Sequence, residues 1–225
     1  TEIDGERYLE IWNLVFMQYE NNPQGRNFTP LPVPCIDTGM GLERLASVLQ
    51  GKTNNYDIDS MALIMNAVRP VISKKTGKSY SADWETSVRV ITDHIRSASF
   101  LISEGLTPGM SGRGYVLKRI IRRAVRYGHK LGIREPFLAE IVPALIESIG
   151  DTYPELAERI EVIQRTLSQE ENAFLMNLDR ALEILEQTFG KASNNTIPAD
   201  VVFKLYDTFG VPADLTELIA KERGW

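Results

Sequence analysis

Residues 37–44 read Asp-Thr-Gly-Met-Gly-Leu-Glu-Arg, a carboxylate and two glycines that lead directly into an amphipathic segment. Glycine lets a backbone come into contact with a nucleotide, and an arginine in the first turn of a helix can bind phosphate or stack on a purine. The spacing therefore suits adenylate chemistry, with Asp37, Gly41 and Arg44 as candidate residues. A glycine turn that only caps a helix is the alternative that this stretch leaves open.

The residues on the amino-terminal side of this stretch predict two strands. Residues 8–19 are dense in aromatic and β-branched side chains, and turn-forming residues follow at positions 20–25, which predicts a buried strand. Prolines at positions 30, 32 and 34 keep the backbone extended, so a second short strand is expected to run back beside the first and to end at Asp37. A strand, a glycine turn and a helix are therefore expected in this order.

The chain after Gly51 has a helical pattern. Apolar residues recur at helical spacing over long stretches, and short Gly, Pro or Asn breaks separate these stretches. Helices are expected near residues 41–49, 59–73, 83–104, 113–131, 136–149, 154–189, 198–209 and 213–223. The predicted fold is mainly α with a small antiparallel β portion, divided into a domain of residues 1–51 and a helical domain of residues 52–225.

Composition is that of a globular protein in a reducing compartment. Of the 225 residues, 43% are hydrophobic and 24% charged, and the formal net charge is −5, which excludes a disordered chain and a basic nucleic-acid coat. Cys35 is the single cysteine, and no apolar stretch approaches the roughly 20 residues of a membrane span. We therefore expect a cytoplasmic protein without membrane contact. The start at Thr1, without a signal-peptide pattern, leads us to expect part of a larger protein.

The strongest local charge pattern is a basic helix. Residues 112–126 read Gly-Arg-Gly-Tyr-Val-Leu-Lys-Arg-Ile-Ile-Arg-Arg-Ala-Val-Arg. At helical spacing the basic side chains form one stripe and the apolar ones fall mainly on the other side. The stripe comprises Arg119, Arg122, Arg123, Arg126 and Lys130. Such a stripe on an acidic protein favours contacts with RNA phosphates, and a solvated basic face or an internal ion-pair network is the alternative.

Other motifs give no nucleophile, general base or metal ligand. His94 is expected to be a structural histidine within a helix, and His129 is expected at the surface. One cysteine and two dispersed histidines provide no zinc spacing, and no serine stands in a Gly-x-Ser-x-Gly turn. Metal-dependent and serine hydrolases are therefore disfavoured.

Asn13 and Asp37 are polar positions on two predicted strands that otherwise carry large apolar side chains. An amide and a carboxylate that face one another can bind the ammonium group of a small zwitterion, and apolar walls then limit the size of its side chain. The sequence thus predicts a pocket at this place. An internal hydrogen-bond network around Asn13 is the alternative.

Five runs, in this order along the chain, resemble the alanyl-tRNA synthetase family. They are residues 10–16 (Glu-Ile-Trp-Asn-Leu-Val-Phe), residues 37–44, Asn55-Tyr56-Asp57, residues 112–124 and residues 205–210 (Leu-Tyr-Asp-Thr-Phe-Gly). The first two resemble the end of a class II catalytic domain with its third signature motif, and the rest resembles the helical tRNA-recognition domain. The first two signature motifs and the editing domain have no counterpart, so this chain alone is not expected to aminoacylate.

The resemblance implies a two-step reaction. Alanine and ATP, with Mg²⁺, give alanyl-adenylate and pyrophosphate, and the acyl group then passes to the terminal ribose of tRNA(Ala). Asn13 and Asp37 would hold alanine, and the ATP-binding residues would be Ile11, Trp12, Asn13, Gly41 and Arg44. The work is positioning and charge balance, without a protein nucleophile or base. Zinc is expected only in the editing domain of the parent chain.

For tRNA, the resemblance implies that Asp207 contacts a G·U wobble pair in the acceptor stem. A carboxylate can accept a hydrogen bond from an exocyclic amine in the wide minor groove of RNA. The family's usual partner is an Asn in a Pro-Ser-Asn run, but residues 108–112 here read Pro-Gly-Met-Ser-Gly. Met110 cannot make that hydrogen bond, which leaves three alternatives: Ser111 makes it, the loop is shifted, or recognition at this position is weaker. The stripe residues Arg119, Arg122, Arg123 and Arg126 are the other candidate tRNA contacts.

Two other functions remain open at this point. The basic stripe would also suit a non-catalytic RNA-binding module. The run at residues 37–44 would also suit a class II paralogue that activates another small amino acid without charging tRNA. The RNA-binding module would bind RNA without using alanine and ATP. The paralogue would use ATP with a different small amino acid and would not charge tRNA.

Overall fold

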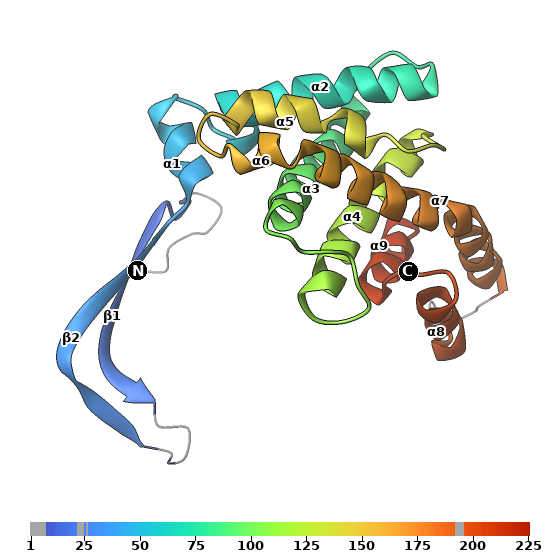
Figure 1. Ribbon diagram of the computed structural model, residues 1–225. Coiled ribbons are helices and arrows are strands. Elements are labelled where there is room, and N and C mark those ends of the chain that lie inside the picture. Colours follow the sequence, from blue (N-terminus) through green and yellow to red (C-terminus); the bar gives the residue numbers. More distant parts are fainter. Residues whose placement is uncertain (1–7, 22–24, 26, 192–195) are drawn as a thin grey trace. The chain divides into compact units, whose positions relative to one another are not determined.

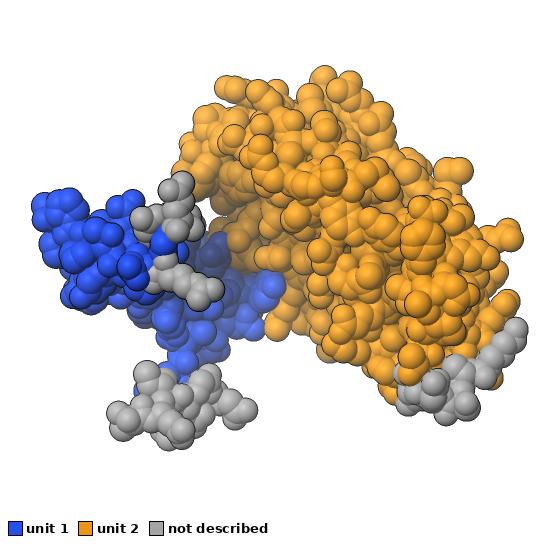
Figure 2. Space-filling view, turned by 90° about the horizontal axis from the view of Figure 1, so that it is seen from below, with its two compact units in different colours: residues 1–59 blue, residues 60–225 orange. Residues whose placement is uncertain are grey.

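The computed structural model describes residues 8–21, 25, 27–191 and 196–225. The chain forms two compact units, residues 1–59 and residues 60–225, which Figure 2 shows in different colours. The predicted fold class, mainly α with a small antiparallel β portion, is confirmed (Figure 1). The division between the units lies at the start of the first long helix, whereas the domain boundary predicted after Gly51 falls within unit 1 and stays a prediction. Of the turn predicted at positions 20–25, residues 22–24 lie outside the described residues, and Glu20 and Asn21 belong to strand β1.

Unit 1 is built on a two-stranded antiparallel sheet. Its elements are β1 (Trp12–Asn21), β2 (Phe28–Met40), α1 (Leu42–Leu49) and the 3-10 turn η1 (Asn55–Asp57). Gly41 alone separates β2 from α1, so the predicted order of strand, glycine and helix is confirmed. The register of β1 on β2 shifts between Met17 and Tyr19. β2 continues past Asp37 to Met40, and the prediction that it ends at Asp37 is therefore wrong.

The prediction that the first strand is buried is also wrong for the described part of the chain. Every residue of β1 is exposed, and the exposed fraction is 54% for Trp12 and 65% for Phe16. A two-stranded sheet offers no second layer, so its apolar side chains need another element to cover them. The aromatic side chains of β1 therefore indicate a surface that is suited to packing against another element.

Helices make up the rest of the described chain. They are α2 (Asp59–Thr76), η2 (Ala82–Trp84), α3 (Glu85–Ser103), α4 (Gly112–Leu131), η3 (Leu138–Glu140), α5 (Val142–Ile149), α6 (Glu155–Glu158), α7 (Ile160–Lys191), α8 (Ala199–Asp207) and α9 (Ala213–Glu222). Each predicted helical stretch contains helix. Three of them are divided. Residues 83–104 hold the end of η2 and α3, residues 136–149 hold η3 and α5, and residues 154–189 hold α6 and most of α7.

Helices α3, α4 and α7 form the centre of unit 2, and α7 runs across the other two (Figure 1). One side of α7 is fully buried at steps of three and four residues, which is the pattern of a helix that packs on one face. This apolar row comprises Ile163, Leu167, Phe174, Leu178, Ala181 and Leu185. The core that results fixes α4 against α7, and both helices carry candidate site residues.

Candidate functional site

Asn13 and Asp37 lie on the same face of the two-stranded sheet. In the antiparallel register Asn13 stands opposite Gly39 and Val15 opposite Asp37. Every second residue of a strand shares a face, so Asn13 and Asp37 are diagonal neighbours, for which a separation of about 7–8 Å is usual. Asp37 is exposed, and its Oδ1 accepts a hydrogen bond from the Thr38 N–H at 2.9 Å. The two groups predicted to hold a small zwitterion are thus brought to one face.

The Asn13 amide also takes part in an internal network, as the alternative interpretation of the sequence allowed. Its Oδ1 accepts a hydrogen bond from the Gly39 N–H at 3.0 Å, and its Nδ2 donates to Glu10 Oε1 at 3.3 Å. A Cβ at position 39 would lie 3.0 Å from Asn13 Oδ1, so a glycine suits this close contact. Because an amide nitrogen carries two hydrogens, Asn13 keeps a donor for a ligand.

The candidate nucleotide residues gather where the sheet meets α1. Arg44 Nη1 donates to the Glu10 carbonyl at 2.5 Å, and the Gly41 N–H donates to the Ile11 carbonyl at 3.1 Å. A Cβ at Gly41 would lie 3.1 Å from Arg44 Cδ, which leaves little room for any side chain there. Trp12 lies on the opposite face of β1 from Asn13 because neighbouring residues of a strand alternate. The site therefore spans both faces of the sheet at its junction with α1.

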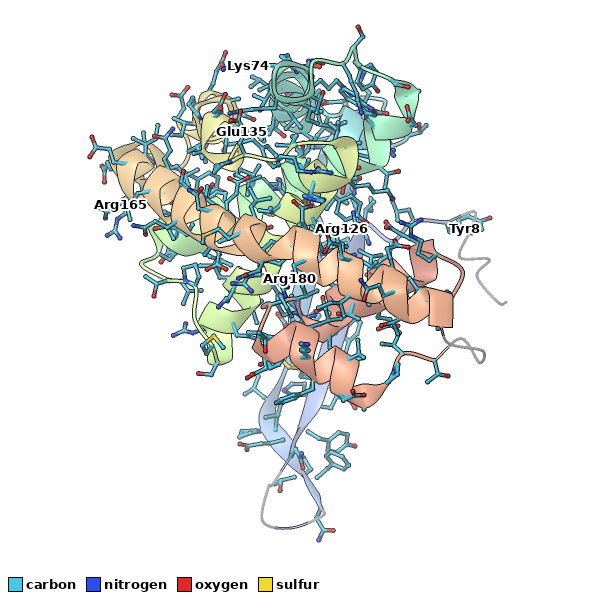
Figure 3. All side chains as sticks on the ribbon, turned by 90° about the vertical axis from the view of Figure 1, so that its right-hand side faces the viewer. Tyr8, Lys74, Arg126, Glu135, Arg165 and Arg180 are labelled. Atoms are coloured by element: carbon cyan, nitrogen blue, oxygen red, sulfur yellow. The ribbon has the colours of Figure 1, made fainter. Side chains whose placement is uncertain are left out.

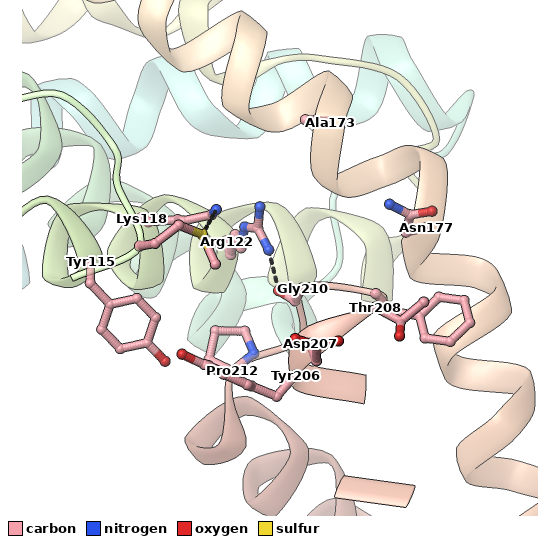
Figure 4. A pocket seen from close by; sticks show the side chains of 12 residues that line it. Tyr115, Lys118, Arg122, Ala173, Asn177, Tyr206, Asp207, Thr208, Gly210 and Pro212 are labelled. Carbon is pink, nitrogen blue, oxygen red and sulfur yellow. Dashed lines mark hydrogen bonds between the residues drawn. The ribbon is translucent and has the colours of Figure 1, made fainter. Parts of the chain in front are cut away.

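A second candidate site is a cavity of about 280 Å³ in unit 2 (Figure 4). It lies where α4, α7 and the turn after α8 meet, and Figure 4 shows Asp207 and Tyr206 on one side with Lys118 and Arg122 on another. The lining residues are Met110, Tyr115, Lys118, Arg122, Ala173, Asn177, Tyr206, Asp207, Thr208, Phe209, Gly210 and Pro212. An exposed carboxylate, an amide and two phenol groups in one hollow can receive the edge of a nucleic-acid base.

Aromatic and cationic contacts shape this cavity. The rings of Tyr115 and Tyr206 meet edge to face, with centroids 6.3 Å apart. Lys118 Nζ lies 3.3 Å from the sulfur of Met110, so Met110 stands at the cavity where the family's usual Asn was expected. Burial lowers the pKa of Lys118, and the charge of Arg122 lowers it further.

Arg122 and Arg126 are buried, with exposed fractions of 7% and 8%. Arg122 Nε contacts Glu170 Oε1 at 2.6 Å, and Arg126 Nη2 contacts Glu222 Oε2 at 2.7 Å. In Figure 3, Arg126 lies among other side chains, whereas the exposed Arg165 extends outward from α7. Direct contacts of Arg122 and Arg126 with RNA phosphates do not fit this burial. The internal ion-pair network, which the sequence left open, describes these two residues.

Arg119 and Arg123 are more accessible. Arg119 Nη2 contacts Asp214 Oδ2 at 2.8 Å, but 40% of its side chain is exposed. Arg123 is partly exposed, and its Nε is buried without a hydrogen-bond partner among the described atoms. Both residues line a cavity of about 200 Å³ together with His94. Of the predicted stripe, these two arginines remain suited to an external anion.

The two histidines differ from each other. His94 Nδ1 lies 3.1 Å from Asp93 Oδ2, in line with a structural role. His129 is 6% exposed and its Nε2 lies 2.7 Å from Asp179 Oδ1, so the prediction of a surface position is wrong. Burial lowers the pKa of His129, and Asp179 opposes that shift. In the described ranges no three His, Cys, Asp or Glu side chains gather to hold a metal ion, and no helix has the length and apolar character to cross a bilayer.

Comparison with known proteins decides the family. The model of the family described as tRNA synthetases class II (A) matches residues 1–225. The chain belongs to this family. It is 53% identical over 222 residues to the alanine-tRNA ligase of Stenotrophomonas maltophilia (strain K279a), and 50% identical over 222 residues to that of Nitrosococcus oceani (strain ATCC 19707).

These class II relatives also confirm the resemblance to alanyl-tRNA synthetases. The alanine-tRNA ligase of Pseudoalteromonas translucida (strain TAC 125) is 50% identical over 222 residues. The matches cover 98% to 99% of this chain and 24% to 25% of the relatives. The chain therefore spans about a quarter of the length of the synthetases it matches.

Sequence reasoning missed some residues of the candidate sites. Asn177 lines the cavity from α7, and no local motif marks it. Lys118 and Tyr206 belong to runs that carry the resemblance, and each stands next to a predicted site residue, Arg119 or Asp207. Their positions in the sequence could therefore have indicated them as cavity residues. Glu170 and Glu222, which pair with the buried arginines, come from distant parts of the chain.

Proposed function

We propose that this chain is part of an alanine-tRNA ligase and that unit 1 supplies part of its alanine and ATP pocket. The observation that carries the proposal is the common face of Asn13 and Asp37 beside the start of α1. In the reaction, a carboxylate oxygen of alanine attacks the α-phosphate of ATP and pyrophosphate leaves. The ribose hydroxyl of tRNA(Ala) then attacks the acyl carbon and AMP leaves.

Each residue of unit 1 has a positioning role in this proposal. The Asp37 carboxylate pairs with the alanine ammonium group, and the Asn13 amide orients the same substrate. Gly41 lets the nucleotide approach the backbone, while Arg44 lies on the nucleotide and balances phosphate charge. Ile11 and Trp12 complete the wall. Holding both substrates in reacting geometry supplies most of the rate enhancement.

Mg²⁺ fits this site as a companion of ATP. Among the described residues, no three acidic, imidazole or thiol side chains lie together in a way that could hold a metal ion. Mg²⁺ is usually bound through one or two carboxylates and substrate phosphates, which suits such a donor set. When bound, the ion neutralises charge on the pyrophosphate leaving group.

For unit 2 we propose recognition of the tRNA(Ala) acceptor stem at the cavity that Asp207 lines. Asp207 accepts a hydrogen bond from an exocyclic amine in the minor groove, and Arg119 and Arg123 contact the phosphate backbone. In this proposal the buried Arg122 and Arg126 do not contact RNA. Their ion pairs instead hold α4 to α7 and α9. We also propose that the parent protein works in the cytoplasm, a reducing compartment that would keep the exposed Cys35 as a thiol.

Pyrophosphate exchange with the whole protein that contains this chain tests the proposal. Exchange should depend on alanine, and Asp37→Asn should lower kcat/KM for alanine about 100-fold, because the ammonium group loses its charged partner. Asp83→Asn, at an exposed aspartate of unit 2, is the matched control and should change nothing. Exchange driven best by another small amino acid would favour the paralogue, and no exchange would favour an RNA-binding module.

A further inference from the structure

Arg122 joins three elements of unit 2. Its Nη1 donates a hydrogen bond to the Gly210 carbonyl, in the turn between α8 and α9, which Figure 4 marks with a dashed line. Its Nε donates to Glu170 on α7 at 2.6 Å, and its guanidinium carbon lies 5.0 Å from the ring centroid of Phe174. One side chain of α4 thus ties the α8–α9 turn to α7.

The α7 contacts fix the direction in which Arg122 points. Glu170 and Phe174 are four residues apart and therefore neighbours on one face of the helix. The carboxylate holds one edge of the guanidinium and the ring supports its plane, so the remaining nitrogens have a set orientation. That orientation brings Nη1 to the Gly210 carbonyl.

The turn at Gly210 is shaped to receive this contact. Gly210 has φ +67°, a left-handed conformation that glycine adopts at little cost. A Cβ at this position would collide with the Arg122 guanidinium. Next to it, the Val211 N–H donates to the Leu205 carbonyl at 2.8 Å, and Val211 is fully buried. The turn is thus held by the Arg122 contact at Gly210 and by the Leu205 contact at Val211.

Asp207 stands at the near end of this turn. It is the last residue of α8, and the segment from Asp207 to Gly210 carries it directly to the Arg122 contact. We infer that Arg122 is a positioning residue for Asp207, and that it sets how well the protein distinguishes base pairs of the acceptor stem. This inference rests on the proposed role of Asp207 in reading that stem.

A direct phosphate contact would need a different environment. Arg122 is 7% exposed, its charge is compensated by Glu170, and two of its three nitrogens already donate within the protein. A phosphate contact contributes to the salt dependence of RNA binding, whereas a buried positioning group does not. The two roles are therefore separable by experiment.

The test uses the whole protein with acceptor-stem microhelices that carry either a G·U or a G·C pair. Arg122→Lys keeps the charge but loses the planar fork that reaches Glu170 and Gly210 together. We expect the ratio of kcat/KM for the two RNAs to fall by about tenfold, and we expect Arg122→Gln, which loses the charge, to leave the salt slope of RNA binding unchanged. The ratio is independent of the fraction of folded enzyme, so lost stability alone does not move it.

A second variant and two controls complete the design. Glu170→Gln removes the charged partner of Arg122 and should lower the same ratio in the same direction, by a smaller factor. Arg165→Lys, at an exposed arginine of α7, should leave the ratio and the slope unchanged. In the Asp207→Ala background, Arg122→Lys should cause no further loss of discrimination, because the group it positions is gone.

The outcomes separate the inference from the proposed function. If Asp207→Ala lowers the ratio but Arg122→Lys and Glu170→Gln leave it within about twofold of the parent, the inference is overturned alone. A shallower salt slope for Arg122→Gln, which loses the charge, with an unchanged ratio for Arg122→Lys would assign Arg122 to a phosphate and also overturn it. If Asp207→Ala itself leaves the ratio unchanged, the proposed role of Asp207 fails and the inference fails with it.

Discussion

Glu171 on α7 accepts a hydrogen bond from the backbone N–H of Leu138 at 3.1 Å, in the interior of unit 2. Glu171 is 0% exposed and takes the position of the apolar row between Leu167 and Phe174. Its Oε1 has no hydrogen-bond partner among the described atoms. An ionised carboxylate is disfavoured in such surroundings, so burial raises the pKa of Glu171 to about 8.

The first prediction is that this group makes the protein less stable as pH rises. The ordinary pKa of Glu171 is 4.5 and its folded value about 8, so the folded protein binds an extra proton between these values. The stabilisation is complete below the unfolded pKa and is lost as pH rises through the folded pKa, by at most about 1.4 kcal/mol per pH unit. Glu171→Gln cannot titrate. Urea unfolding of both proteins from about pH 5 to about pH 9 measures the difference.

The control for this prediction is Glu161→Gln at an exposed position of α7, which should follow the parent at every pH. The parent should lose free energy of unfolding relative to Glu171→Gln as pH rises. A difference between the two that stays constant over this range would show that Glu171 does not titrate in the folded protein.

The second prediction concerns the glycine of the α8–α9 turn. Gly210→Ala should destabilise unit 2 by about 1–3 kcal/mol, because alanine resists the left-handed conformation and its methyl group displaces Arg122. The melting temperature of the chain measures the effect. Gly190→Ala is the matched control, since a Cβ there meets no atom within 4 Å and glycine lowers helix stability. Equal melting temperatures for parent and Gly210→Ala would contradict the prediction.

The third prediction concerns Arg126. Arg126→Ala should lower the free energy of unfolding by about 1–3 kcal/mol, because it removes a buried partner of Glu222 and packed side-chain methylenes. Glu222 keeps Lys130 at 2.8 Å, which limits the loss. Arg165→Ala, which removes an exposed arginine, should change stability by less than about 0.5 kcal/mol. A stability loss no larger than that of the control would mean that the pair contributes little.

The fourth prediction concerns Arg123, a partly exposed arginine of α4. In the whole protein, Arg123→Ala should weaken binding of an acceptor-stem microhelix and make its salt dependence shallower by about 0.7–0.9 in the log-log slope, the amount expected for one lost phosphate. Binding titrations at several salt concentrations measure the slope. Arg165→Ala should keep the parent slope, and an unchanged slope for Arg123→Ala would exclude a phosphate contact.

Helices were predictable from the sequence because their apolar spacing is a local property. The stretch predicted at residues 136–149 is divided into η3 and α5. Pro143 lies in the first turn of α5, where the N–H that proline lacks is not needed, so a new helix begins there. The break at Arg159, between α6 and α7, has no comparable signal. For the sheet, the aromatic residues of β1 predicted a covered strand, but composition cannot say which part of a protein supplies the cover.

The candidate sites were predictable in part. The register of β1 on β2 puts Asn13 and Asp37 on one face of the sheet, and the pocket expected there stays a prediction. Which arginines of the stripe are buried was not predictable. Helical spacing gathers Arg122 and Arg126 on one side of α4, but their partners Glu170 and Glu222 lie 48 and 96 residues away. Only the packing of α7 and α9 determines which arginines are covered.

The ion pairs between α4 and α9 also have a mechanical consequence. Arg119 pairs with Asp214 near the start of α9, and Arg126 pairs with Glu222 at its end, so the two pairs advance in the same direction along both helices. Sliding α9 by one helical turn, about 5.4 Å, would break both pairs at once. Both ion pairs therefore oppose a displacement of α9 along α4.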